Sequence, residues 1–312
     1  MIKYLYVLVS DEIDYYLEQA LMSITSLMIH TPDAFISLLI DDTTERTLKG
    51  NRGDVLGLVN ELKVIEIPPQ FNKKARSRWL KTSMRKYIEN DFLYIDCDTI
   101  VSGSLTDTVN FTIDLGAVLD THVPLIKSQF RKNIQSNDKA LAFNASFVLD
   151  NFFNSGVIFC KDVPTCHSFF NEWHRLWLGG IGVGVLIDQP SFNQANLNLG
   201  ATAITEIDGM WNCQISICGG INFLADAKII HYFSTLLNHK NPFELANACI
   251  FQRIKKLGFL DKELQTFLLY PKRKFSLQTR LEVRRTREIF RDIFLHYFYA
   301  LTKFFRTNKM IL

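Results

Sequence analysis

The sequence predicts an α/β fold in which a doubly wound, Rossmann-like sheet carries helices on both faces. Over the first hundred residues, short apolar runs alternate with segments whose apolar residues recur every three or four positions, as in β-α-β units. The chain has 312 residues, of which 47% are hydrophobic and 21% charged, so it can bury one large core. Polar residues follow the first and fourth apolar runs directly, where sheets of this class bind ligands.

Four strands are expected in this first part, because each is a short apolar run bounded by polar residues or proline. They comprise residues 3–9, 34–40, 62–67 and 92–96. Helices are expected between them, over residues 15–30, from 41 to about 60, and over 78–88. The first helix carries Leu17, Leu21, Ile24 and Met28 on one stripe, and the polar residues 41–44 suit the N-cap of the second.

Beyond residue 101 the alternation is less regular. Strands are expected at 115–119, 156–160 and 228–231, and helices at 163–178, 187–197 and 242–257. Residues 124–150 are polar and irregular, which predicts a long loop that acts as a lid or lines the acceptor side. The glycine-rich residues 179–184 match neither a dinucleotide-binding motif nor a P-loop, so they predict a turn or hinge.

The C-terminal residues differ from the rest in charge. Residues 271–312 contain 11 Lys and Arg residues against 3 Asp and Glu, so this tail carries +8 and residues 1–270 carry −5 of the net +3. Between 276 and 305, phenylalanine and leucine form a broad face beside several arginines, which predicts a basic amphipathic helix on an anionic membrane surface. A helix packed on its own domain is the alternative. We expect one domain over 1–270 and a helical tail over 271–312.

The apolar runs, the first residues and the cysteines indicate where the protein is located. No run of 18 apolar residues is present, and acidic residues follow the apolar start at once, so neither a membrane span nor a signal peptide is expected. The six cysteines form no CxxC pair and no zinc spacing, which predicts reduced thiols in a cytoplasmic protein. No nucleic-acid partner is expected.

The most informative segment is Asp96-Cys97-Asp98, at the end of the fourth expected strand. Because alternate side chains of a strand point the same way, Asp96 and Asp98 share a face and Cys97 points away. Two carboxylates at the carboxyl end of a strand suit a divalent cation, which can in turn hold a diphosphate. Ordinary turn carboxylates are the alternative.

Five short motifs follow one another in a specific order. They are Val9-Ser10-Asp11 with Tyr15-Tyr16, Leu93-Tyr94-Ile95-Asp96-Cys97-Asp98, Phe153-Asn154-Ser155-Gly156-Val157, Asp188-Gln189 with Asn193, and Trp211-Asn212 followed by His231-Tyr232. In this order and spacing the chain resembles glycosyltransferase family 8 over roughly residues 1–245. Members of that family are retaining, metal-dependent enzymes of the GT-A fold, which has a mixed sheet, and include bacterial lipopolysaccharide galactosyl- and glucosyltransferases. The resemblance implies transfer of a hexose from a UDP-sugar to a glycan or glycolipid acceptor, at the cytoplasmic face of the inner membrane.

The resemblance also implies roles for individual residues. Asp96, Asp98 and His231 would bind Mn²⁺ or Mg²⁺, and the nitrogen ligand favours Mn²⁺ somewhat. Asp188 and Gln189 would face the anomeric carbon as catalytic groups. Further contacts to the UDP-sugar would come from three groups of residues. Val9, Asp11 and Tyr15 (or Tyr16) would contact the uridine, and Asp120 and Asn154 would contact the sugar. Arg78, Cys97 and Lys240 would contact the part of the donor between them.

Three departures from the family pattern concern these expectations. Ser234 stands where members often have glycine, Lys240 belongs to a displaced version of a Lys-Pro-Trp motif, and Pro190 replaces a second aspartate.

Two other functions compete with the glycosyltransferase. One is a sugar nucleotidyltransferase, against which the acidic, glycine-free residues 10–14 argue. The other is a catalytically silent, membrane-associated module that binds a nucleotide sugar.

Overall fold

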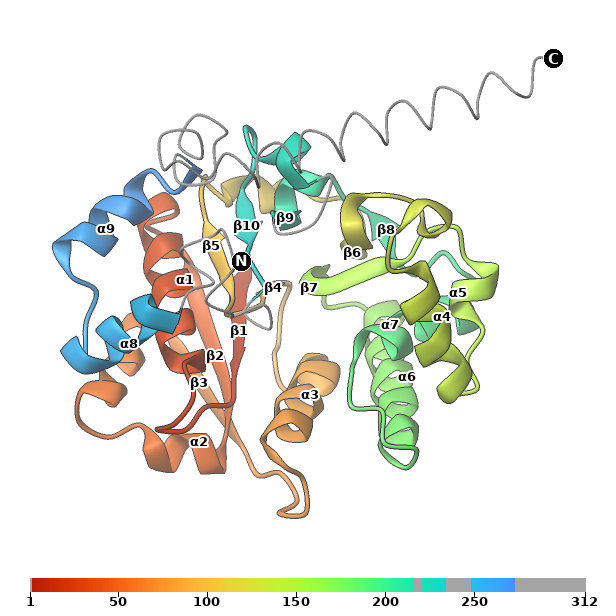
Figure 1. Ribbon diagram of the computed structural model, residues 1–312, viewed down its shortest axis with the longest axis horizontal. Helices are drawn as coiled ribbons and strands as arrows, with labels where there is room; N and C mark the ends of the chain where they lie inside the picture. The colour runs from red at the N-terminus through yellow and green to blue at the C-terminus, as the bar shows by residue number, and fades with distance from the viewer. Residues whose placement is uncertain (1, 216–219, 234–247, 273–312) are drawn as a thin grey trace.

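The computed structural model describes residues 2–215, 220–233 and 248–272 (Figure 1). The basic tail from residue 273 onward, Ser234 and Lys240 lie outside the described residues. Within those ranges, no helix combines the length and the apolar character needed to cross a bilayer.

A seven-stranded mixed sheet forms the centre of the molecule, in the order β3-β2-β1-β4-β7-β6-β8. Its strands are β1 (Lys3–Leu8), β2 (Phe35–Asp41), β3 (Glu61–Ile65), β4 (Phe92–Ile95), β6 (Leu115–Leu119), β7 (Phe153–Cys160) and β8 (Thr205–Glu206). The first four are parallel, whereas β7 runs antiparallel to both β4 and β6. The reversal of β7 places its first residues beside the carboxyl end of β4, and the Asp96 amide donates to the Gly156 carbonyl at 2.8 Å.

Helices cover both faces of this sheet (Figure 1). On one face lie α3 (Lys73–Ser83), α6 (Pro164–Ile181) and α7 (Gln189–Asn198), which share a core with Leu5, Phe92 and Ile158. On the other lie α1 (Tyr16–His30) and the 3₁₀ helix Gly50–Leu58, which bury Leu17, Ile24 and Val55. The short α2 (Asp42–Thr47) begins at the Asp41 N-cap, whose side chain accepts from the Thr44 amide.

A second, three-stranded sheet brings the end of the domain back to the end of β4. It contains β5 (Thr99–Val101), β10 (Ile229–His231) and β9 (Cys213–Gln214), with β10 in the middle. In this sheet His231 pairs with Thr99, which directly follows Asp98. The sheet shares a core with α1, α8 (Ala248–Leu257) and α9 (Lys262–Leu269), which lie at the left of Figure 1.

Most predicted elements are confirmed, with shifts at their ends. The strand expected at 156–160 begins earlier, at Phe153, and the helix expected at 78–88 begins at Lys73, behind an Asn72 N-cap that accepts from the Ala75 amide. The expected helix from 41 to about 60 is two helices, α2 and the 3₁₀ helix Gly50–Leu58.

The expectation of a loop over 124–150 is wrong, because this region contains α4 (Arg131–Ala140) and α5 (Ala145–Val148). It buries Leu125, Ile134 and Ala145 in a small core of its own. The polar composition of this region predicted a loop because it gives no sign that a polar residue is buried. Asp138 is buried, and its carboxylate accepts from the Ser146 amide at 2.7 Å and so joins the two helices.

Phe192 provides a test of the packing that holds α7. Its ring is fully buried and lies edge to face with Trp173 at 4.7 Å and with Phe169 at 5.3 Å. We expect Phe192→Ala to lower the free energy of unfolding by about 3–5 kcal/mol, because it opens a cavity there. Urea unfolding measures this, with Phe259→Ala as control: Phe259 is 58% exposed, and its loss should cost under about 1 kcal/mol. Equal losses in the two variants would contradict this account of the core.

Candidate active site

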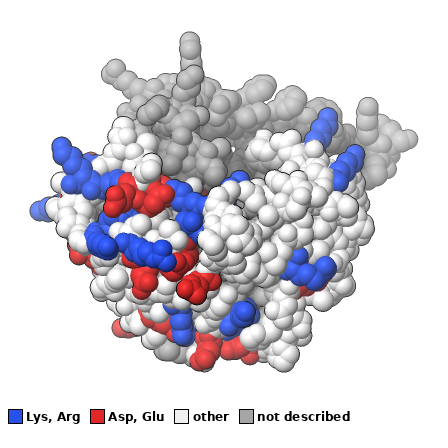
Figure 2. All heavy atoms as spheres, turned by 90° about the horizontal axis from the view of Figure 1, so that it is seen from below, with Lys and Arg blue, Asp and Glu red and all other residues white. Residues whose placement is uncertain are grey.

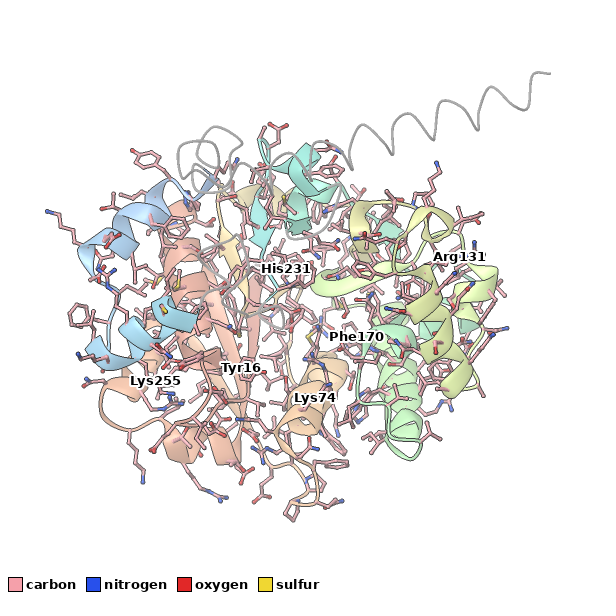
Figure 3. All side chains as sticks on the ribbon, viewed as in Figure 1. Tyr16, Lys74, Arg131, Phe170, His231 and Lys255 are labelled. Atoms are coloured by element: carbon pink, nitrogen blue, oxygen red, sulfur yellow. The ribbon has the colours of Figure 1, made fainter. Side chains whose placement is uncertain are left out.

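The carboxyl end of β4 meets the end of β10 at one cluster of three side chains. One ligand atom each from Asp96, Asp98 and His231 lies within 4.8 Å of the others. His231 Nε2 and Asp98 Oδ1 are 3.3 Å apart. In Figure 3, His231 lies near the centre of the molecule, between the α1 side and the α6–α7 side. The structure thus brings together the three residues predicted to bind a metal.

The donor set fits a divalent cation. Two carboxylates offer hard oxygen ligands and the imidazole offers a borderline nitrogen, a combination that suits Mn²⁺ and is acceptable to Mg²⁺. His231 is buried, and its ring stacks on Phe233 at a centroid distance of 4.0 Å. A ring held in this way cannot swing freely toward or away from the two carboxylates.

Gly156 provides the space for His231. A Cβ atom at this position would lie 2.5 Å from His231 Cε1, 2.8 Å from His231 Nδ1 and 2.9 Å from Asn154 Oδ1. Backbone strain is not the reason for the glycine, since its φ is not in the left-handed region. The glycine of the Asn-Ser-Gly segment is therefore required by packing against the histidine.

Lys81 is the principal site residue that the sequence analysis missed. Its buried ammonium lies 3.1 Å from Asp96 Oδ1 and 3.2 Å from Asp188 Oδ2, so it joins the predicted metal ligands to the predicted catalytic pair, Asp188 and Gln189. A lysine in an amphipathic helix ordinarily faces solvent, which explains the omission. Its spacing of three residues from Arg78 was the available signal, because such residues share a helix face.

Asp188 is held in its charged form by two cations. Arg78 Nε lies 2.8 Å from Asp188 Oδ1, and the Ser155 hydroxyl donates to Asp188 Oδ2 at 2.9 Å. Burial by itself would raise the pKa of Asp188, but Lys81 and Arg78 outweigh it and hold that pKa well below the ordinary range. Asp188 is therefore ionised at neutral pH.

Asp120 and Asn154, which were predicted to contact the sugar, form a second cluster with Gln189 beside Asp188. Asn154 Nδ2 donates to Asp120 Oδ1 at 3.0 Å and more weakly to Gln189 Oε1 at 3.4 Å. Burial raises the pKa of Asp120, and hydrogen bonds from Asn154 and Gln189 offset this in part. Thr121 and His122, which follow Asp120, both have left-handed backbone conformations, with φ of 61° and 58°. Such strain is maintained where surrounding contacts fix a side chain at a functional site.

At the predicted uridine end, the residues have other partners. The Asp11 carboxylate lies 2.6 Å from Lys73 Nζ and accepts from the Ile13 amide. The Tyr15 ring stacks on Phe251 of α8 at 6.2 Å. Tyr16 is 43% exposed and so has more free surface for a base. The face seen from below in Figure 2 carries basic and acidic side chains interspersed, as such ion pairs require.

The side chains of Val9 and Cys97, two further predicted donor contacts, pack against the core around the central sheet. The Val9 side chain is buried in the core, and the Cys97 thiol points toward β1, where it approaches the Val7 carbonyl at 3.4 Å. The expectation that Cys97 points away from the two aspartates is confirmed. Lys240, the remaining predicted contact, lies outside the described residues.

The chain also matches a known family of enzymes over most of its length. The family model described as "Glycosyl transferase family 8" matches residues 9–236. The chain belongs to glycosyltransferase family 8. It is accordingly a retaining glycosyltransferase, and the sugar nucleotidyltransferase alternative is excluded. No curated protein sequence matches the chain.

Solved structures show the same GT-A fold. The galactosyltransferase LgtC, in complex with donor and acceptor sugar analogues, aligns with 85% of this chain and 99% of its own at 15% identity and a TM-score of 0.54. The bifunctional glycosyltransferase WbbM aligns with 81% of this chain at 17% identity and a TM-score of 0.51. This chain spans about half of the WbbM chain, since the alignment covers 49% of it.

Gly156→Ala tests the packing around His231. Because the new Cβ invades the space of the ring, we expect Mn²⁺ affinity to fall roughly tenfold or more while the fold is kept. Calorimetric titration with Mn²⁺ measures this. The matched control is Gly179→Ala in α6, where a Cβ meets nothing within 4 Å. Unchanged Mn²⁺ affinity in the Gly156 variant would contradict the packing argument.

His122 predicts a pH dependence of stability. Burial lowers its pKa to about 4, and the Gln214 amide donates to its Nε2 at 2.9 Å, so the folded state holds it neutral. The unfolded chain binds that proton near pH 6.5, so stability falls as the pH drops from about 6.5 to 4. In urea unfolding at pH 7, 6 and 5, His122→Gln should show a shallower decline than the wild type, by up to about 1.4 kcal/mol per pH unit. Parallel declines would show that His122 is not the responsible group.

Proposed function

We propose that this family 8 enzyme transfers a hexose, glucose or galactose, from a UDP-sugar to a glycan or lipid-linked saccharide. The observation that carries the proposal is the position of Lys81, which links Asp96 of the metal-binding cluster to Asp188 of the catalytic pair. A donor whose diphosphate lies at Asp96 and Asp98 would thus have its sugar beside Asp188. The galactosyltransferase activity named for LgtC supports the choice of sugars.

Asp96, Asp98 and His231 would hold Mn²⁺ or Mg²⁺. When bound, the cation neutralises the charge that develops on the diphosphate as the glycosidic bond breaks. Lys81 lies against Asp96, where its ammonium adds positive charge on the same side. The uridine would be bound by Val9, Asp11 and Tyr15 or Tyr16, and Lys240 is a further candidate for the diphosphate.

The groups at the sugar would stabilise an oxocarbenium-like centre. The ionised Asp188 and the amide oxygen of Gln189 present negative charge to the anomeric carbon. Arg78 and Ser155 hold Asp188 in one orientation, so little reorganisation accompanies the reaction. Asp120 and Asn154 would bind the sugar hydroxyls. Retention is compatible with a same-face attack or with a covalent intermediate.

We infer the acceptor class and the location from the composition of the tail over residues 271–312. A tail rich in Arg and Phe would place the enzyme on the anionic cytoplasmic face of the inner membrane, where a glycolipid acceptor is available. This suits synthesis of a bacterial surface polysaccharide or lipopolysaccharide.

Metal-dependent hydrolysis of UDP-sugars is the direct test. We expect purified protein to release UDP from UDP-galactose or UDP-glucose with Mn²⁺, and removal of the ion with EDTA to abolish release. Asp98→Asn and His231→Gln should lower the rate more than about 100-fold, and Lys81→Met should do so by a similar factor that Lys81→Arg partly restores.

The matched control is Asp54→Asn, a surface carboxylate outside the site, which should keep the wild-type rate. Full activity of the Asp98 and His231 variants would refute the site assignment. Binding of UDP without turnover of any sugar would favour the catalytically silent module instead.

Vesicle binding tests the tail. In sedimentation assays with phosphatidylglycerol-containing vesicles, the full chain should bind in a salt-sensitive way, because its arginines neutralise lipid charge. A chain that ends at Tyr270 should not bind, and a full chain with Arg284, Arg285 and Arg287 changed to Gln should bind more weakly. Equal binding by all three proteins would exclude the membrane role.

A further inference from the structure

A series of hydrogen bonds between buried amides connects the backbone of β7 to His231. Gly156 N lies 2.9 Å from Asn154 Oδ1, Asn212 Nδ2 lies 2.9 Å from the same oxygen, and Asn212 Oδ1 lies 3.0 Å from His231 Nδ1. Asn154 is 4% exposed, Asn212 is 0% exposed and His231 is 2% exposed. Such groups depend on one another to satisfy their hydrogen-bonding capacity.

The direction of this series is fixed at its start. The Gly156 backbone N–H can only donate, so the Asn154 atom facing it must be the amide oxygen. The Asn154 NH₂ group then faces Asp120 Oδ1 and Gln189 Oε1, both of which accept. Reversal of the Asn154 amide would set its NH₂ group against the Gly156 N–H, with no acceptor between them.

The orientation of Asn154 determines that of Asn212. The Asn154 oxygen can only accept, so the Asn212 group that faces it is the NH₂ donor, and the Asn212 oxygen faces His231. Since that oxygen can only accept, His231 Nδ1 must carry a hydrogen. In the neutral imidazole the lone pair is then on Nε2, the atom 3.3 Å from Asp98 Oδ1.

We propose that Asn212 is a positioning residue that fixes His231 in the Nδ1–H tautomer and so presents the Nε2 lone pair to the cation. The inference builds on the metal role given under the proposed function, although the tautomer is argued from the amide contacts alone. The Asn154 amide serves both sides in one orientation. Its NH₂ group donates to Asp120 and Gln189, and its oxygen accepts from Asn212, which contacts the histidine.

A purely structural role for Asn212 is the competing explanation. It would predict lower stability when Asn212 is replaced, without any change in the state of the His231 ring. The tautomer of that ring therefore separates the two explanations, and it can be observed without metal, donor or turnover.

The test uses the full chain labelled with ¹⁵N-histidine and free of metal. Long-range ¹H–¹⁵N spectra distinguish the tautomers, and the His231 signals are those that vanish in His231→Gln. The pH is raised until these signals stop changing, so that the ring is neutral. We expect the Nδ1–H pattern in the wild type, and a change toward the Nε2–H tautomer in Asn212→Leu. Asn212→Asp should keep the Nδ1–H pattern, because a carboxylate still accepts from Nδ1.

Titration with Mn²⁺ alone gives the second measurement. Loss of an outer partner of a metal-binding histidine typically costs about 10–100-fold in affinity, which is the loss expected for Asn212→Leu. The matched control is Asn196→Leu, since Asn196 is equally buried but caps a loop through the Ile204 amide and does not contact His231. It should change neither the tautomer nor the Mn²⁺ affinity.

The Nε2–H pattern in the wild type would overturn the proposal without any variant, so it stays testable if Asn212→Leu fails to fold. An unchanged tautomer and unchanged Mn²⁺ affinity in folded Asn212→Leu would also overturn it. The Nδ1–H tautomer in a protein that turns over no UDP-sugar would refute the proposed function but leave the role of Asn212 intact.

Discussion

The antiparallel position of β7 between β4 and β6 is the constraint on which the site depends. In a fully parallel sheet, the residues after β4 would lie beside the end of another strand. Here they lie beside the start of β7, so Asp96 pairs through its amide with the Gly156 carbonyl. Asn154 and Ser155 thereby come within reach of Asp120 and Asp188. One strand reversal thus brings residues from four distant segments together.

Charge balance is the second requirement of this arrangement. The Asp188 carboxylate is largely removed from water, which by itself disfavours its charged form, and Asp96 lies on the other side of Lys81. Lys81 neutralises this charge from between Asp96 and Asp188, and Arg78 adds a second cation at Asp188. Both cations come from α3, so the placement of that helix controls the electrostatics of the site. A divalent cation at Asp98 and His231 would complete the balance.

The aromatic core beneath α7 gives the site its rigidity. Trp173 Nε1 donates to the Asp188 carbonyl at 3.0 Å, and Phe192 packs against the same ring. The Asn193 side-chain amide satisfies both backbone groups of Phe153, as a paired strand would. Its oxygen accepts from the Phe153 N–H, and its NH₂ group donates to the Phe153 carbonyl. The beginning of α7 is thus held against α6 and β7, and Asp188 and Gln189, the proposed catalytic pair, lie at that junction.

The sequence by itself determined the α/β class, most elements, and the residues at the ends of β4, β7 and β10, because these follow from local apolar patterns and short motifs. The tertiary structure alone decided which of them meet and what they bond. Lys81 is a buried ion-pair partner only because α3 packs over the sheet, and Tyr15 is covered by Phe251 from more than two hundred residues away. The two helices within 124–150 are joined by the buried Asp138, whose carboxylate accepts from the Ser146 amide, a contact that no periodicity reveals. Local propensity acts over a few residues, whereas burial and charge pairing depend on segments that meet only when the chain is folded.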